Sequence, residues 1–180
     1  MLDKELSVEL KQYLLVNYRP EGGVEKHFVE DTPKKSDVFP PILGMAAGLF
    51  RILQGTDSLV RHLDMSFSEK LMWWIKERKR TPVEIYRAAG VTKAHFAKIR
   101  NNPQYHPTKE TVLAFVIALH LSVEEAKDLL ERAGYALSKS HLGDMIVKCF
   151  LEMQRYNIDE INEALYIHEC KPLTNWRESK

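Results

Sequence analysis

The side chains best suited to specific chemistry lie close together, between residues 92 and 101. If this stretch is a helix, its period places one set on a common outward side: Thr92, Lys93, Ala94, Ala97, Lys98 and Asn101. Lysine can donate to guanine edges in the DNA major groove, asparagine can pair with adenine through two hydrogen bonds, and alanine can contact the thymine methyl. We therefore expect a helix that reads double-stranded DNA. The alternative is that the lysines are only solvated and that Asn101 caps the helix end.

Positive charge is concentrated around this stretch. Residues 65–110 carry ten Lys and Arg against four Asp and Glu, whereas residues 1–64 carry eight against ten and residues 111–180 eight against eleven. A basic segment in a chain of net charge +1 is typical of a surface that meets a polyanion. The candidates for phosphate contacts are Arg78, Lys79, Arg80, Arg100 and Lys109. The alternatives are a Lys-rich helical surface with no partner and, more distantly, RNA binding by the same face.

Other kinds of chemistry have little support in the sequence. There is no nucleophile elbow, phosphate-binding Walker loop or dinucleotide fingerprint. The spacing of His141, Cys149, His168 and Cys170 does not form a tetrahedral metal set. Trp73 and Trp74 are adjacent, so only one can face a core, and the other is expected to cover a junction or a partner. We expect no enzyme activity, no cofactor and no metal.

The expected DNA-reading helix needs neighbours that position it, and the sequence marks them with helix-capping signals. Thr81, Pro82 and Glu84 form a strong helix start, and Gly90 can end that helix in a left-handed conformation. Thr92 caps the next helix, in which Phe96 and Ile99 face inward, and Asn102-Pro103 ends it. Two short helices joined by a tight turn have the geometry of a helix-turn-helix.

Similar signals predict helices over most of the remaining chain. Capping boxes begin at Ser66 and Ser122, Thr108 caps a helix with apolar residues at helical spacing, and two more helices are expected at about 141–154 and 157–167. No segment alternates like a strand, so the fold class is all-α. We expect three parts: an N-terminal arm of residues 1–64, a helix-turn-helix domain of residues 65–137 and a C-terminal helical extension of residues 138–180 packed on it.

The N-terminal arm is the least regular part of the sequence. Its first residues predict an amphipathic helix that ends near Tyr18, and residues 19–41 predict a loop. Short helices are expected at 42–54 and 57–64. The apolar stretch 39–53 is interrupted by Pro, Gly and Arg and cannot span a bilayer, and the first five residues do not resemble a signal peptide. With only two cysteines, these features predict a cytoplasmic protein.

Residues 66–134 resemble the Cro and lambda-repressor (XRE-like) type of helix-turn-helix domain. The matching residues are Thr81, Glu84, Ile85, Ala89, Gly90, Val91, Thr92, Phe96 and Ile99, together with the later runs Pro107–Leu113 and Ala118–Ala126. Residues 57–174 are also similar to a poorly characterised family of bacterial helix-turn-helix-like proteins. That similarity rests on Phe67–Glu69, Glu84–Tyr86, Phe96–Asn102, Ala133–Ser138 and Glu160–Leu165. The resemblance implies a five-helix fold with two added C-terminal helices, and brings no established biochemical function.

Two residues depart from the repressor pattern. Tyr86 stands where that pattern prefers Ala or Gly, because the two helices cross closely there, so the helices must splay or the ring must find another slot. Pro82 stands where repressors usually carry Gln, and proline has neither an amide donor nor a side-chain amide. These departures and the near-neutral net charge favour a protein-interaction adaptor with no catalytic role that no longer reads DNA. The basic segment and the small, polar outward side favour a DNA-binding transcriptional regulator.

Both functions imply further partners. A single repressor-type module makes too few contacts for high specificity, so DNA binding predicts a homodimer. The two C-terminal helices or the apolar residues 42–53 would supply its interface. The adaptor would recruit a protein through the N-terminal arm or the C-terminal helices.

Overall fold

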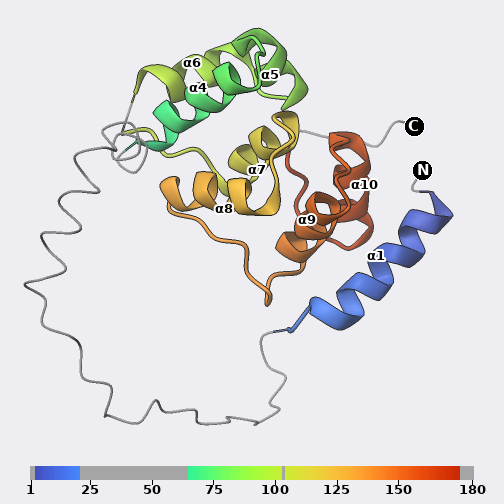
Figure 1. The fold of residues 1–180 in the computed structure, drawn as a ribbon. Coiled ribbons are helices and arrows are strands. Elements are labelled where there is room, and N and C mark those ends of the chain that lie inside the picture. Colours follow the sequence, from blue (N-terminus) through green and yellow to red (C-terminus); the bar gives the residue numbers. More distant parts are fainter. Residues whose placement is uncertain (1–2, 21–64, 103, 175–180) are drawn as a thin grey trace, which may run out of the picture. The chain divides into compact units, whose positions relative to one another are not determined.

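The structure is a computed structural model that describes residues 3–20, 65–102 and 104–174 (Figure 1). These residues form eight α-helices and no strand, which confirms the all-α fold class. The helices are α1 (Lys4–Asn17), α4 (Phe67–Glu77), α5 (Pro82–Ala88), α6 (Lys93–Asn101), α7 (Lys109–Ala118), α8 (Val123–Arg132), α9 (Leu142–Glu152) and α10 (Ile158–Ile167). The helices expected at 42–54 and 57–64 lie outside the described residues.

The chain divides into two compact units. One unit combines Met1–Gly22 with Ser66–Lys180, and the other is Gly23–Met65. Helix α1 therefore belongs to the same unit as α4 to α10, whereas the sequence predicted an arm that includes all of residues 1–64. A backbone hydrogen bond from the Arg19 N–H to the Lys139 carbonyl (3.0 Å) joins the end of α1 to the segment before α9.

The predicted capping signals begin the helices as expected. The capping boxes at Ser66, Thr81 and Ser122 are complete, with both reciprocal hydrogen bonds formed. Each satisfies two amide groups that an unpaired helix end would leave without partners. The cap of α9 was not predicted: His141 Nδ1 accepts the Asp144 N–H at 3.3 Å and lies 3.2 Å from Asp144 Oδ1. Histidine is not among the usual capping residues, so its role here was not evident from the sequence.

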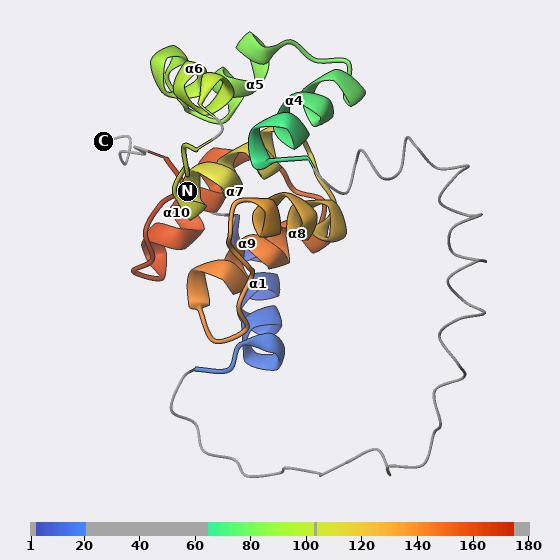
Figure 2. The same ribbon diagram turned by 90° about the vertical axis from the view of Figure 1, so that its left-hand side faces the viewer.

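Helix α7 lies at the centre of the larger unit. It contacts α5 on one side and α8 and α10 on others (Figures 1 and 2). Every residue from Val112 to Ile117 is buried, including Phe115, one of the largest fully enclosed side chains. A helical segment that is apolar all round is typical of such a central position, because none of these six residues meets solvent. The layer of α4, α5 and α6 and the pair α9 and α10 therefore share one core.

Helix α1 packs on α9 but keeps apolar side chains on its other side. Leu6, Leu10 and Leu14 are buried and form the contact with α9, which lies beside α1 in both ribbon views (Figures 1 and 2). Two side chains near the end of α1 point to solvent, with exposed fractions of 85% for Leu15 and 77% for Val16. An exposed pair of this kind on a short helix is a candidate contact surface.

The adjacent tryptophans divide as the sequence predicted. Trp74 is buried in the core, whereas Trp73 is half-buried, and their rings meet edge to face with centroids 4.7 Å apart. The Lys70 ammonium lies 4.6 Å from the Trp73 ring centroid and 3.1 Å from Asp128 of α8. The Lys70–Asp128 ion pair therefore joins α4 to α8.

Candidate nucleic-acid interface

The candidate interface is built on α5, the turn of residues 89–92 and α6. Pro82 occupies the first turn of α5, where a missing N–H costs no intrahelical hydrogen bond. The turn is possible because Gly90 adopts a left-handed conformation with φ +63°. The Thr92 hydroxyl then accepts the His95 N–H at 3.2 Å and begins α6. These local features set the direction in which α6 leaves the turn.

The core fixes which side of α6 faces outward. Phe96 and Ile99 are buried, and the Phe96 ring lies 6.0 Å from that of Phe115 in α7. The opposite side, which we call the outward side of α6, holds the six residues predicted as base contacts. Ala97 is half-buried, and the other five are exposed: Thr92, Lys93, Ala94, Lys98 and Asn101. The structure therefore brings all six together on one accessible surface.

The two lysines of the outward side are available for an external partner. Among the described residues, no carboxylate forms an ion pair with Lys93 or Lys98. The Lys98 ammonium lies over the Tyr105 ring, 4.4 Å from its centroid, and the Tyr105 hydroxyl lies 3.1 Å from His95 Nε2. This contact steadies Lys98 without neutralising its charge. The side-chain oxygen of Asn101, Oδ1, accepts a hydrogen bond from Arg100 Nε at 3.0 Å. The side-chain NH₂ group of Asn101 takes no part in that contact.

The five residues predicted as phosphate contacts differ in their surroundings. Lys79 and Arg100 are exposed and form no ion pair with a described carboxylate. Arg78 donates to Glu125 at 2.8 Å, and Arg80 lies 3.4 Å from Glu84. Both pairs are partly exposed, so they contribute little stability and can exchange for a phosphate.

Lys109, the fifth predicted phosphate contact, is paired with a carboxylate of α9. Its ammonium lies 2.5 Å from the buried Asp144 carboxylate of α9. To contact a phosphate, Lys109 would have to leave a carboxylate that is only 2% exposed, and that separation is costly. The geometry therefore favours a structural role for Lys109, and the phosphate role remains a sequence prediction that its surroundings do not favour.

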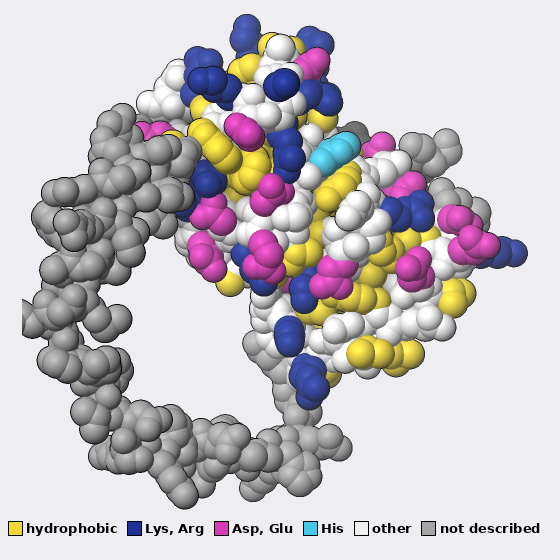
Figure 3. All heavy atoms as spheres, in the orientation of Figure 1, with side chains coloured by type: hydrophobic (Ala, Val, Ile, Leu, Met, Phe, Trp, Pro, Cys, Tyr) yellow, Lys and Arg dark blue, Asp and Glu magenta, His cyan; other side chains and the backbone are white. Residues whose placement is uncertain are grey.

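Positive charge dominates the surface near α4, α5 and α6. Lys and Arg side chains gather over this layer, whereas Asp and Glu side chains are spread over the part of the same face that lies below it (Figure 3). Burial, and next the charges of Arg80 and Arg78, lower the pKa of His120.

The Tyr86 ring packs beside the core. It is half-buried and packs at a tilt against Phe96, with ring centroids 5.6 Å apart. The Tyr86 carbonyl also accepts the Val91 N–H at 2.8 Å across the turn. The larger side chain is thus accommodated while the turn remains hydrogen-bonded.

We expect Tyr86→Ala to lower the free energy of unfolding by about 1–2 kcal/mol, because only a half-buried ring and one aromatic contact are lost. Chemical denaturation measures this change. Tyr86→Phe keeps the ring and is the matched control, with an expected change below about 0.5 kcal/mol. A loss above about 3 kcal/mol for Tyr86→Ala would mean that the ring is part of the central core.

A contact that the sequence analysis missed joins the turn to the C-terminal end of the unit. Asn162 of α10 is fully buried, and its side chain accepts the Leu173 N–H at 2.8 Å and donates to the Thr174 hydroxyl at 3.0 Å. This places Thr174 against Gly90, where a Cβ on Gly90 would come within 2.9 Å of Thr174 Cγ2. The signal in the sequence was an asparagine on the buried side of an apolar helix, but its partners lie eleven and twelve residues away.

Two glycines allow the contact with Thr174 to be measured. Gly134 also has a positive φ, +76°, but a Cβ there would meet nothing within 4 Å. We expect Gly134→Ala to cost about 1 kcal/mol of folding stability, from backbone conformation alone. Gly90→Ala should cost about 1–2 kcal/mol more, from the clash with Thr174.

Thr174→Ser, which removes Cγ2 but keeps the hydroxyl, should recover most of that excess in the Gly90→Ala background. Equal costs for the two glycine substitutions, measured by denaturation, would show that Thr174 does not lie against the turn.

The described residues hold no metal centre and no membrane-spanning helix. No three His, Cys, Asp or Glu side chains among them are grouped so that they could hold a metal ion. The Cys170 thiol contacts the His168 carbonyl at 3.5 Å, and Cys149 is buried in α9. None of the helices in this part of the chain combines the length and apolar character needed to cross a bilayer.

The chain matches no family model, no curated protein and no solved structure.

Proposed function

We propose that this chain is a DNA-binding helix-turn-helix protein of the repressor type that regulates transcription, with α6 entering the major groove. The observation that supports it is the outward side of α6, where two exposed lysines without a described carboxylate partner lie beside an exposed asparagine and an exposed alanine. The protein would act by binding and not by catalysis.

In the proposed complex the outward side reads the bases. Lys93 and Lys98 would donate to guanine, and the Ala94 methyl would contact thymine. Asn101 could pair with adenine without losing its contact to Arg100, because an amide oxygen accepts two hydrogen bonds. The shallow contour of Ala94 and Ala97 would let the helix approach the base edges closely.

Phosphate contacts would come from the cations that are free or weakly paired: Arg78, Lys79, Arg80 and Arg100. Each contact releases condensed counterions, so the affinity should fall with salt by a slope of about −0.9 per phosphate. Four contacts predict roughly a 150-fold loss of affinity when the salt concentration rises fourfold.

Fluorescence-anisotropy titration of the full chain against mixed genomic duplex fragments, at about 50 and about 200 mM salt, tests the proposal. A steep loss of binding with salt supports it and justifies a search for the operator. A folded protein that does not bind at the lower salt contradicts it.

A homodimer is part of this proposal. A symmetric dimer would place two copies of α6 about 34 Å apart, in successive major grooves. Among the described residues, Leu15 and Val16 of α1 are the most exposed large apolar side chains and are one candidate interface; Tyr166 and Ile167 of α10, in the predicted C-terminal extension, are the other. If α1 forms the interface, sedimentation of the wild type and of Leu15→Ser/Val16→Ser should give a dimer and a monomer.

The same apolar residues support a second candidate function, a protein-interaction adaptor. In that case Leu15 and Val16 would bind a different protein, and the double serine variant would lose it while keeping any DNA affinity. Deletion of residues 141–180 is not a usable test, because it would remove Phe150 and Asn162, which are fully buried in the core.

A further inference from the structure

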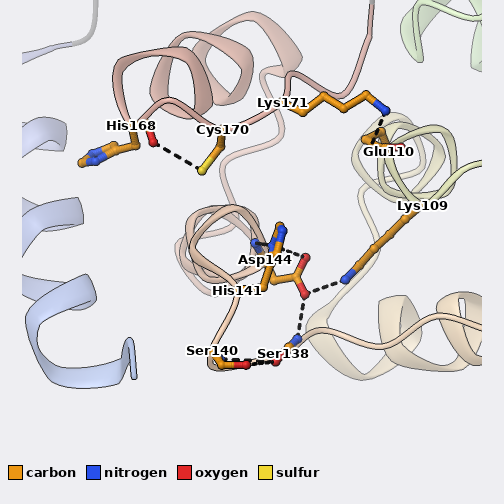
Figure 4. A network of polar contacts seen from close by, with 9 residues as sticks. All are labelled: Lys109, Glu110, Ser138, Ser140, His141, Asp144, His168, Cys170 and Lys171. Carbon is orange, nitrogen blue, oxygen red and sulfur yellow. Dashed lines mark hydrogen bonds and ion pairs between the residues drawn. The ribbon is translucent and has the colours of Figure 1, made fainter. Parts of the chain in front are cut away.

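After α10 the chain runs back toward the turn of residues 89–92. Its residues 170–174, which we call the strap, contact the rest of the unit on the way. The Lys171 ammonium lies 3.0 Å from the carboxylate of Glu110 in the first turn of α7 (Figure 4). The Leu173 side chain is buried in the core. The strap is therefore held by the body of the unit before it reaches the turn.

Asn162 of α10 fixes the end of the strap. Its side chain is fully buried and uses both of its polar ends: Oδ1 accepts the Leu173 N–H at 2.8 Å, and Nδ2 donates to the Thr174 hydroxyl at 3.0 Å. A buried amide is costly unless its hydrogen-bonding groups find partners. Here both partners belong to the strap. Asn162 therefore determines where Thr174 lies.

Thr174 in turn lies on the turn between α5 and α6. Its Cγ2 and Cβ are 2.9 and 3.2 Å from the position that a Cβ on Gly90 would take. Two hydrogen bonds close this turn: the Gly90 N–H donates to the Arg87 carbonyl at 3.0 Å, and the Val91 N–H donates to the Tyr86 carbonyl at 2.8 Å. Since α6 begins just after the turn, the conformation at Gly90 sets the direction of α6.

We propose that Asn162 is a positioning residue for α6. Through the strap it holds the turn of residues 89–92, and the turn fixes the direction in which α6 meets DNA. Its part in DNA reading rests on the proposed function, whereas its hold on the turn does not. Without this restraint the turn would sample more conformations, and DNA binding would have to order it. The C-terminal extension would thus raise the affinity without contacting a base.

The end of α8 provides a matched control within the same molecule. Gly134, like Gly90, has a positive φ. Its hydrogen bonds follow the same pattern: the Gly134 N–H donates to the Glu131 carbonyl and the Tyr135 N–H to the Leu130 carbonyl, both at 2.9 Å. A Cβ at Gly134 would meet nothing within 4 Å, so no strap covers this turn. The amides of Val91 and Tyr135 can therefore be compared directly.

Amide hydrogen exchange of the full chain, followed by NMR, tests the hold on the turn without DNA. Asn162→Ala should raise the exchange rate of the Val91 amide, relative to that of Tyr135, by about fivefold. The ratio is used because a core substitution also lowers global stability, which affects both amides. An unchanged ratio would overturn the proposal.

Two variants of the half-buried Thr174 test the same path without a core substitution. Thr174→Val keeps the methyl that lies on Gly90 and removes the hydroxyl that Asn162 binds, whereas Thr174→Ser keeps the hydroxyl and removes that methyl. Each should raise the Val91 ratio by about threefold, and neither should raise it further in the Asn162→Ala background. A Thr174→Val ratio equal to that of the wild type would mean that Asn162 does not hold the turn, whatever the result for Thr174→Ser.

DNA affinity gives the functional consequence. Thr174→Val should weaken duplex binding by about threefold and leave the salt slope unchanged, because no cation is removed. A raised Val91 ratio with unchanged affinity, or a reduced salt slope, would contradict a positioning role in DNA reading. A folded wild type that does not bind DNA would contradict the proposed function, and the exchange ratio alone would then decide whether Asn162 holds the turn.

Discussion

Replacement of Lys93 and Lys98 together by alanine should weaken binding to duplex DNA by roughly 30- to 1,000-fold, or about 2–4 kcal/mol. Both side chains are exposed on the outward side of α6, and neither forms an ion pair with a described carboxylate. Their loss should therefore leave the helical circular dichroism signal unchanged. The Lys98 contact with Tyr105 is lost as well, which should lower stability by no more than about 1 kcal/mol.

The matched control removes the same charge from another surface. Lys4→Ala/Lys11→Ala changes two exposed lysines of α1 and should alter DNA affinity less than about threefold. If Lys93 and Lys98 contact bases, the loss should be greatest for the preferred sequence; if they contact phosphates, it should be uniform and reduce the salt slope by about one per residue. Unchanged affinity in the Lys93/Lys98 variant would exclude α6 as the recognition helix.

Lys109→Met should lower the free energy of unfolding by about 3–5 kcal/mol, the largest stability effect that we expect. This substitution leaves the Asp144 carboxylate, which is 2% exposed, without its ammonium partner. Two groups remain beside it: the Ser138 N–H donates to the carboxylate at 2.8 Å, and His141 Nδ1 lies 3.2 Å from Asp144 Oδ1 and offsets the charge only when the ring is protonated. A buried charge without an opposite charge is more costly than the absence of the pair.

The double variant should be more stable than Lys109→Met alone. Adding Asp144→Asn to Lys109→Met removes the stranded charge and should recover at least about 1 kcal/mol, although it is a second core substitution. The control is Lys127→Met, which breaks the exposed Lys127–Glu124 pair and should cost less than about 0.5 kcal/mol. Urea denaturation of the wild type, Lys109→Met, Asp144→Asn and the double variant gives the cycle, and Lys127→Met is measured beside them. A double variant less stable than Lys109→Met would show that Asp144 is not held by this ion pair.

Much of the helical framework was predictable because its signals are local. The Ser66–Glu69 and Thr81–Glu84 boxes, the left-handed Gly90 and the Thr92 cap each involve residues within one helical turn. The surface of α6 was predictable for the same reason. Once Phe96 and Ile99 face a core, helical geometry places Lys93, Lys98 and Asn101 on the other side.

The exact surroundings of the predicted side chains were not predictable. The sequence places Lys109 in a basic segment, and only the tertiary structure brings it against Asp144, thirty-five residues later. It likewise gives no indication that Thr174 packs on Gly90, since that contact depends on Asn162 in a third segment. Long-range partners of this kind leave no periodic trace in a single sequence.

The sequence by itself determined the all-α class, the starts of α4 to α8 and the side chains that share the outward side of α6, because capping and helical period act over a few residues. Only the tertiary structure decided that residues 112–117 of α7 are enclosed on all sides and that α1 joins the same compact unit. These features depend on how separate helices fill space together, and that is a property of their packing and not of any one segment.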